Sequence, residues 1–358
     1  MTQRIYFDHA ATTPVLPEAR AAMAAATERW ANPSSPHSEG RGSRALLEKA
    51  RETIGRMLGW SHDVIFTSGA SEAVAIAAGR ARVSGRIVGA TEHAIVPYEM
   101  GEEAKVVPVG PDGIIDMSAL EAVLEAGPSL VAIQQVNNET GVIQPIAEIV
   151  EIVRSAGSLL LADCAQSAGK IALPDADFIA VSAHKLGGPP GIGALLVKDP
   201  ATLEPTGGQE KGYRRGTQDM PAAAAFAAAL ESRAFASAMP RLAVLRQRLE
   251  EGVKESGGVV IAKDSPRIPN IGALALPGAS QAILLAQFDL AGFAVSAGSA
   301  CSSGKMKESA VLAAMNVDRK LASSFLRISF GPSTSEEEVD SFLSEWRRIA
   351  ERAAAKAA

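Results

Sequence analysis

Residues 178–197 read FIAVSAHKLGGPPGIGALLV, and this stretch decides the class of fold. Its two apolar runs, 178–182 and 193–197, are typical of strands buried on both faces of a sheet. The first run ends in a turn rich in glycine and proline that contains Lys185. A lysine at the end of a buried strand needs a charge partner or a covalent bond, because an isolated buried ammonium is unfavourable. The alternative is a lysine on a solvated loop.

Outward from this segment, short apolar runs alternate with amphipathic stretches. Further strands are expected at 64–67, 86–90, 105–109, 130–134, 158–162, 259–261, 271–276 and 325–330. Helices are expected at 71–82, 146–155 and 241–254, and from Ser118, Met220, Ser280, Ser309 and Ser335 onward. The alternation predicts an α/β fold with a mostly parallel sheet covered on both faces. The pattern of the sequence changes after Pro205, and we place a domain boundary near Pro240.

Composition narrows the class of protein. The chain has 358 residues, a size typical of two domains, and 47% of them are hydrophobic. The net charge of −5 argues against a nucleic-acid partner, and the longest apolar run, 222–230, is far too short for a membrane span. Only two cysteines occur, and no secretion signal opens the sequence. We therefore expect a cytoplasmic protein.

Three further features lie at the ends of predicted strands. Asp163 closes the run LLLAD (159–163), at the edge where open parallel sheets bind ligands. His93 follows another strand and is placed to stack on a ring or move protons. The segment TSGASE (67–72) joins a strand to a helix, where free N–H groups favour an anion. Each feature alone also fits a structural role, such as capping or core packing. Together, a lysine, an aspartate and an anion site are what pyridoxal phosphate requires.

The two cysteines differ in their surroundings. Cys301 lies in the Ser/Gly-rich loop VSAGSACSSGK (295–305), where nearby lysines would lower the thiol pKa, so we interpret it as a nucleophile. Cys164 follows an apolar strand and is expected to be inert. Arg327, in the apolar strand LRISF (326–330), needs an anion, either a substrate carboxylate or a structural salt bridge.

With these residues identified, the sequence resembles the cysteine desulfurases, fold-type I pyridoxal-phosphate enzymes of the class V aminotransferase superfamily. It is most similar to the nitrogen-fixation and iron–sulfur assembly group (group I), whose nucleophile lies in a long Ser/Gly loop. The matching segments are YFDHAATTP (6–14), NPSSPHSEGR (32–41), IFTSGASE (65–72), TEHAIV (91–96), VNNETGVIQPI (136–146), DCAQSAGK (163–170), SAHKLGGPPGIG (182–193), GGQEKGYRRGT (207–217), SAGSACSSG (296–304) and LRISFG (326–331).

The resemblance implies a role for each matching residue. Lys185 would form the Schiff base, Cys301 would accept the sulfur, and His93 would stack on the ring and handle protons. Asp163 would pair with the pyridinium nitrogen, and Gln166 would bond the ring hydroxyl. The implied phosphate contacts are Ala70, Ser71, Ser182 and His184, with Thr217 supplied by the partner subunit of a homodimer. The residues implied near the substrate are Asn32, Asn138, which also lies near the cofactor, and Arg327, which binds the carboxylate.

The resemblance also implies the architecture and the reaction. A large domain (13–240) would hold a seven-stranded, mainly parallel sheet, and a smaller α+β domain (1–12 and 241–358) would carry the Cys301 loop. The enzyme would convert L-cysteine to L-alanine, leaving a persulfide on Cys301 for an acceptor in iron–sulfur cluster or thio-cofactor assembly. The alternatives are a selenocysteine lyase, another class V aminotransferase-like enzyme, and a non-catalytic sulfur carrier or scaffold. No metal site is expected, because the histidines and cysteines lack metal-ligand spacing.

Overall fold

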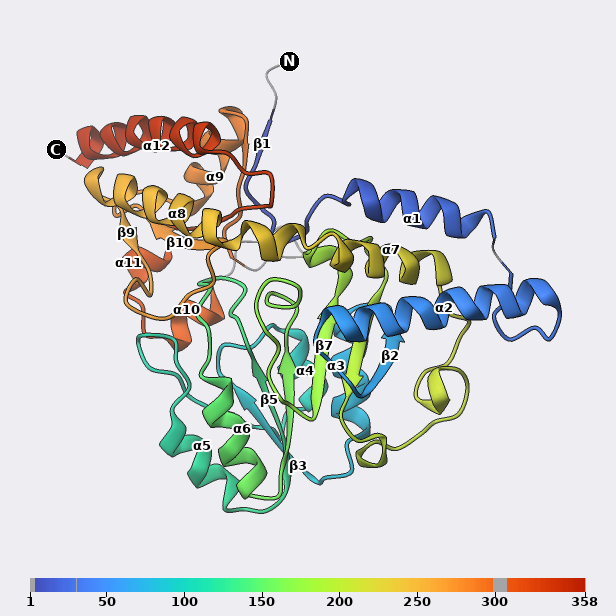
Figure 1. Ribbon diagram of the computed structural model, residues 1–358. Helices are drawn as coiled ribbons and strands as arrows, with labels where there is room; N and C mark the ends of the chain where they lie inside the picture. The colour runs from blue at the N-terminus through green and yellow to red at the C-terminus, as the bar shows by residue number, and fades with distance from the viewer. Residues whose placement is uncertain (1–3, 30, 299–307, 358) are drawn as a thin grey trace.

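A central sheet organises the larger part of the molecule (Figure 1). The computed structural model describes residues 4–29, 31–298 and 308–357. The sheet has seven strands, in the spatial order β2 (Asp63–Thr67), β8 (Gly193–Val197), β7 (Phe178–Ser182), β6 (Leu159–Asp163), β5 (Ser129–Gln134), β3 (Gly85–Gly89) and β4 (Lys105–Val107). All neighbours are parallel except β8, which is antiparallel to both β2 and β7. The predicted mainly parallel α/β fold is therefore confirmed.

Alternate residues of each strand enter two separate cores. In β7, Ile179 and Val181 pack into the core that also contains Phe226, whereas Phe178 and Ala180 pack into the other core. Because successive side chains of a strand point to opposite faces, a continuous apolar strand needs helices on both sides. The helices of this part are α1 (Pro17–Thr27), α2 (Ser38–Met57), α3 (Ala70–Arg80), α4 (Ile95–Met100), α5 (Met117–Leu124), α6 (Ile146–Ser155) and α7 (Met220–Glu231).

The remaining elements bring both ends of the chain together. Their strands are β1 (Ile5–Tyr6), β9 (Val259–Val260), β10 (Ile271–Ala275), β11 (Phe293–Ala294) and β12 (Phe325–Ser329), and their helices are α8 (Ala234–Glu255), α9 (Gln281–Leu290), α10 (Ala310–Ala314), α11 (Arg319–Ala322) and α12 (Glu336–Ala357). Strand β1 pairs with β11, and β10 lies between β12 and β9. Phe7 and Phe342 make an edge-on contact, with ring centroids 5.9 Å apart. The N-terminal strand thus packs with the C-terminal helices.

The helix expected at 241–254 begins earlier than predicted. Helix α8 starts at Ala234 and continues through Pro240. Proline lacks the N–H that would bond the preceding turn, but burial of Phe235, Met239 and Leu242 stabilises the helix on both sides of it. The boundary that we placed near Pro240 therefore falls inside a continuous helix. Helices α7 and α8 are separated at Arg233, whose φ is 52°. Helices α1 and α2 lie before residue 64, where no helix was expected from the sequence.

Candidate active site

Lys185, Asp163 and His93 lie at the edge formed by the carboxyl ends of the parallel strands. Lys185 is in the 3₁₀ turn Ala183–Lys185 directly after β7, Asp163 ends β6, and His93 follows β3. Burial raises the pKa of the Asp163 carboxyl, whereas a hydrogen bond from Ala165 N–H and the nearby His93 and Lys185 charges lower it. The Asp163 carboxyl therefore lies within electrostatic reach of both His93 and Lys185.

The Lys185 amine is directed at the N-terminal segment of the chain. Its Nζ donates to the backbone carbonyls of Ala10 and Ala11, each at 2.7 Å. Burial and the Arg327 charge lower the Lys185 pKa to about 8, and the carboxylates of Asp163 and Asp8 oppose this shift. A lysine with this pKa is partly neutral near neutral pH, and a neutral amine is the nucleophilic form.

A network of hydrogen bonds fixes the turn that carries His93. Gln134, at the end of β5, donates from Nε2 to the Thr91 carbonyl at 2.5 Å, and Asn137 Nδ2 donates to the same carbonyl at 3.1 Å. Glu92 Oε1 accepts from Gln134 N–H at 2.9 Å. Burial raises the pKa of Glu92 well above its ordinary range, and the Asp163 charge raises it further, which favours the protonated acid. The sequence analysis did not single out Glu92, although an acid beside His93 at a strand end was a usable signal.

The predicted anion site forms where β2, α3 and β7 meet. The first intrahelical bond of α3 runs from Ala73 N–H to Gly69 O, so the N–H groups of Ala70 and Ser71 precede it at the helix end. Gly69 has a φ of +155°, and a Cβ on it would lie 3.7 Å from Ser182 Oγ. A glycine at this position lets a ligand approach the backbone closely.

The side chain of His184 lies beside the same N-terminal segment. Its Nδ1 is 3.1 Å from Thr12 Oγ1. Burial, with the charges of Lys185 and Lys170, lowers the His184 pKa to about 4. The imidazole is therefore neutral near neutral pH and offers one donor and one acceptor.

Arg327 is buried in β12, with a side chain only 3% exposed. Its Nη2 donates to Asp8 Oδ1 at 2.8 Å and its Nη1 to the Asn138 carbonyl at 2.9 Å. Its Nε has no hydrogen-bond partner among the described residues. The guanidinium thus has both a structural salt bridge and an unused donor, and Asp8 is a site residue that the sequence analysis missed because it lies 319 positions from Arg327.

Two other predicted residues are buried next to this cluster. Gln166 Nε2 donates to the Ala10 carbonyl at 2.9 Å, and its buried Oε1 has no partner in the part of the chain that the structure describes. Cys164 is fully buried, with Sγ 3.4 Å from Gln135 Oε1, and burial raises the pKa of its thiol. A buried thiol with a raised pKa is a poor nucleophile, as expected from the sequence.

The remaining predicted residues are Cys301, Asn32 and Thr217. Cys301 lies outside the described residues. Asn32 is exposed on the connection between α1 and α2, and Thr217 is exposed on the loop 203–219. These two segments lie beside each other, because Ser34 Oγ donates to Gln209 Oε1 at 3.4 Å. Both residues therefore face outward in the single chain.

A sequence model of the aminotransferase class-V family matches residues 5–342. The chain belongs to this family. A cysteine desulfurase of Cereibacter sphaeroides is 33% identical to it, over 95% of this chain and 94% of the relative. The solved NifS-like protein from Rickettsia africae superposes with a TM-score of 0.90 at 29% identity, covering 98% of this chain and all (100%) of that chain. The solved structure of SspA in complex with cysteine gives a TM-score of 0.78 at 27% identity, covering 92% of this chain and 100% of that chain.

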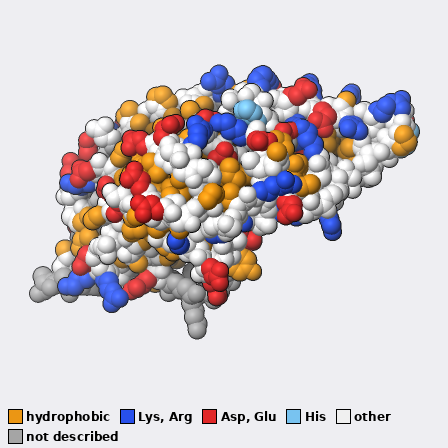
Figure 2. Space-filling model, turned by 90° about the horizontal axis from the view of Figure 1, so that it is seen from below, with side chains coloured by type: hydrophobic (Ala, Val, Ile, Leu, Met, Phe, Trp, Pro, Cys, Tyr) orange, Lys and Arg blue, Asp and Glu red, His pale blue; other side chains and the backbone are white. Residues whose placement is uncertain are grey.

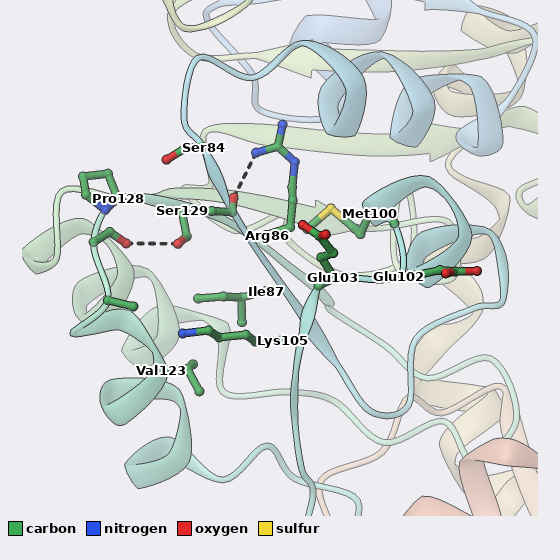
Figure 3. A pocket seen from close by; sticks show the side chains of 15 residues that line it. Ser84, Arg86, Ile87, Met100, Glu102, Glu103, Lys105, Val123, Pro128 and Ser129 are labelled. Atoms are coloured by element: carbon green, nitrogen blue, oxygen red, sulfur yellow. Dashed lines mark hydrogen bonds between the residues drawn. The ribbon is translucent and has the colours of Figure 1, made fainter.

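A separate pocket lies at the opposite edge of the sheet in this class-V aminotransferase family member. A pocket of about 490 Å³ opens at the amino ends of β3, β4 and β5, which start at Gly85, Lys105 and Ser129 (Figure 3). Arg86 in its wall donates to backbone carbonyls, including that of Val83 at 2.6 Å. Charged side chains of both signs are interspersed on the face seen from below (Figure 2). None of the predicted site residues lines this pocket, and the candidate active site is the edge with Lys185.

Among the described residues, no group of three or more His, Cys, Asp or Glu side chains is arranged to hold a metal ion. None of the described helices combines the length and apolar character that a bilayer crossing needs.

Proposed function

We propose that this protein is a pyridoxal-phosphate-dependent cysteine desulfurase, which converts L-cysteine to L-alanine and leaves a persulfide on Cys301. The observation that carries the proposal is the convergence of Lys185, Asp163 and His93 at one edge of the sheet. The relative from Cereibacter sphaeroides, named a cysteine desulfurase, supports the reaction class.

The residues at this edge fit pyridoxal phosphate. The buried Gln166 Oε1 is an acceptor without a partner among the described residues, as a ring hydroxyl would require. The Gly69 turn and Ser182 fit a phosphate group, and Lys185 has the lowered pKa, about 8, that a carbonyl-binding amine needs. When bound, pyridoxal phosphate supplies an electron-withdrawing ring that stabilises negative charge at the substrate α-carbon.

In the proposed reaction, each residue of the site has its own role. The Asp163 carboxylate holds a positive ring nitrogen, and Lys185 Nζ accepts the α-proton while His93 assists proton movement. The Arg327 guanidinium, oriented by Asp8, binds the substrate carboxylate. The Cys301 thiolate forms a bond to the substrate sulfur as the carbon–sulfur bond breaks. The bonding pair stays with the carbon fragment, which takes up one proton at the β-carbon, regains one at the α-carbon from Lys185 and leaves as alanine.

The same proposal covers assembly and sulfur delivery. We infer a homodimer in which the outward-facing Thr217 and Asn32 serve the partner's site, because their two loops lie together on one surface. We assign residues 13–240 to the large domain, and 1–12 with 241–358 to the small one, so that α8 runs from one domain into the other. The sulfur would pass to an acceptor protein of iron–sulfur cluster or thio-cofactor assembly in the cytoplasm.

The test compares wild type with Cys301→Ser, using Cys164→Ala as the matched cysteine control. Both variants should keep the visible absorption of bound pyridoxal phosphate. Wild type and Cys164→Ala should form alanine and sulfide from L-cysteine in the presence of a thiol reductant, and Cys301→Ser should not. Normal turnover by Cys301→Ser would refute the role of Cys301. Faster turnover of selenocysteine than of cysteine, even in Cys301→Ser, would favour a selenocysteine lyase instead.

A further inference from the structure

One turn of the chain contacts the Thr91 carbonyl near His93 and also approaches Gly298 and Ser309. In this turn, residues 136–143, Asn137 Oδ1 accepts from the N–H groups of Glu139 and Thr140 at 2.9 and 2.8 Å. The side chain of Asn137 also donates to the carbonyl of Thr91, two residues before His93. An amide with its donor and its acceptor both engaged in buried bonds fixes the backbone around it.

Glu139 projects from this turn to both ends of the segment 299–307. Its side chain is buried, and its Oε2 accepts a hydrogen bond from Ser309 Oγ at 2.5 Å. On the other side, Gly298 packs so closely that a Cβ on it would lie 2.9 Å from the same oxygen. Ser309 in turn accepts from Leu312 N–H at the start of α10. One carboxylate thus contacts the last described residue before Cys301 and a residue just after its segment.

The turn also contacts the proposed substrate-binding arginine. Arg327 Nη1 donates to the carbonyl of Asn138, the neighbour of Glu139. This one turn therefore helps to fix the positions of four residues: His93, Arg327, Gly298 and Ser309. A displacement of Glu139 would change the ends of the Cys301 segment relative to the groups that hold the substrate.

We propose that Glu139 is a positioning residue for sulfur transfer: by fixing Gly298 and Ser309, it determines where the thiol of Cys301 can reach. The inference rests on the proposed function. Cys301 is three residues after Gly298 in the sequence. Three residues span at most about 11 Å, so the position of Gly298 limits the volume available to the thiol. Glu139 acts through these anchors and does not contact the substrate.

The experiment separates cysteine binding from the thiol-dependent step. The variants are Glu139→Ala and Glu139→Gln, with Glu148→Gln on the exposed side of α6 as the matched control. Cysteine binding is followed by the change in visible absorption of the holoenzyme, and persulfide on Cys301 by rapid quench and mass spectrometry. For Glu139→Ala we expect cysteine affinity within about twofold of wild type and persulfide formation slowed about tenfold to hundredfold, as for a reacting group misplaced by about 1 Å. Glu139→Gln, which keeps an oxygen acceptor for Ser309, should recover part of the rate.

A double-mutant cycle with Gly298→Ala provides a second test in case Glu139→Ala folds poorly. Gly298 has a φ of +90°, and its new Cβ would press on Glu139 Oε2. If the two residues act together, the double variant slows persulfide formation by less than the product of the single effects. A persulfide rate equal to wild type in Glu139→Ala, or equal losses in cysteine binding and persulfide formation, would overturn the proposal. A wild-type enzyme that forms neither alanine nor persulfide would instead overturn the proposed function.

Discussion

The carboxylate of Glu210 ties the loop 203–219 to α2 and β2, and its removal tests how strongly this buried ion pair stabilises the fold. Its Oε2 accepts from Arg51 Nη1 at 2.6 Å and from Phe66 N–H at 2.8 Å. Its Oε1 accepts from Arg51 Nη2 at 3.0 Å and from Gln218 Nε2 at 2.8 Å. The side chain of Glu210 is 0% exposed and that of Arg51 is 14% exposed. Arg51, Gln218 and the Phe66 N–H therefore all donate to this one carboxylate.

Glu210→Ala leaves the Arg51 charge and the buried Phe66 N–H without this acceptor. Breaking a buried pair by removing one partner costs about 3–5 kcal/mol in the free energy of unfolding. For a chain of 358 residues, the unfolding entropy near the midpoint is about 0.75 kcal/mol/K. The melting temperature should then fall by about 4–7 °C. Arg51 keeps a second ion pair with Glu48, which places the expected loss toward the lower end.

The assay is the thermal melt followed by circular dichroism, with Glu204→Ala, an exposed acid on the same loop, as the control. Glu204→Ala should melt within about 1 °C of wild type, because exposed substitutions cost little. The double variant Arg51→Met/Glu210→Ala should recover part of the loss, since it removes the unpaired buried charge. A melting temperature unchanged in Glu210→Ala, or a double variant less stable than the single one, would refute the reasoning.

Two further predictions concern charge at the site. Burial and the Lys170 charge lower the His9 pKa to about 4. The unfolded chain then binds a proton between about pH 6.5 and 4 that the folded chain does not, so stability falls by up to about 3 kcal/mol as the pH drops through this window. Urea unfolding at pH 7 and 4.5 should show a smaller loss for His9→Gln, and an equal loss in both proteins would contradict the assignment. Arg327→Gln removes a positive charge beside Lys185, so the pH midpoint for capture of added pyridoxal phosphate should rise above about 8. The same variant should raise KM for cysteine about tenfold to hundredfold through loss of a charged hydrogen bond, and an unchanged KM would count against carboxylate binding by Arg327.

Much of the site was predictable because it follows from local pattern. Asp163, His93 and Lys185 each lie at or shortly after the end of an apolar run, and the ends of parallel strands meet at one edge of the sheet. The glycine of the 67–72 segment and the inert character of Cys164 were predicted from local sequence in the same way. Helix α8 was misjudged at its start, because the packing of its apolar face outweighs the local preference of Pro240 to break a helix.

The sequence by itself determined the alternation of strands and helices, the mainly parallel sheet, and the polar residues at its carboxyl edge. These features depend on periodicity and on neighbours a few positions apart. Only the tertiary structure decided the partners of the buried charges: Asp8 for Arg327, Ser309 for Glu139 and Glu210 for Arg51, which are separated by 319, 170 and 159 positions. A buried charge must find a partner, but which partner it finds depends on how distant segments cross, and no local pattern encodes that crossing.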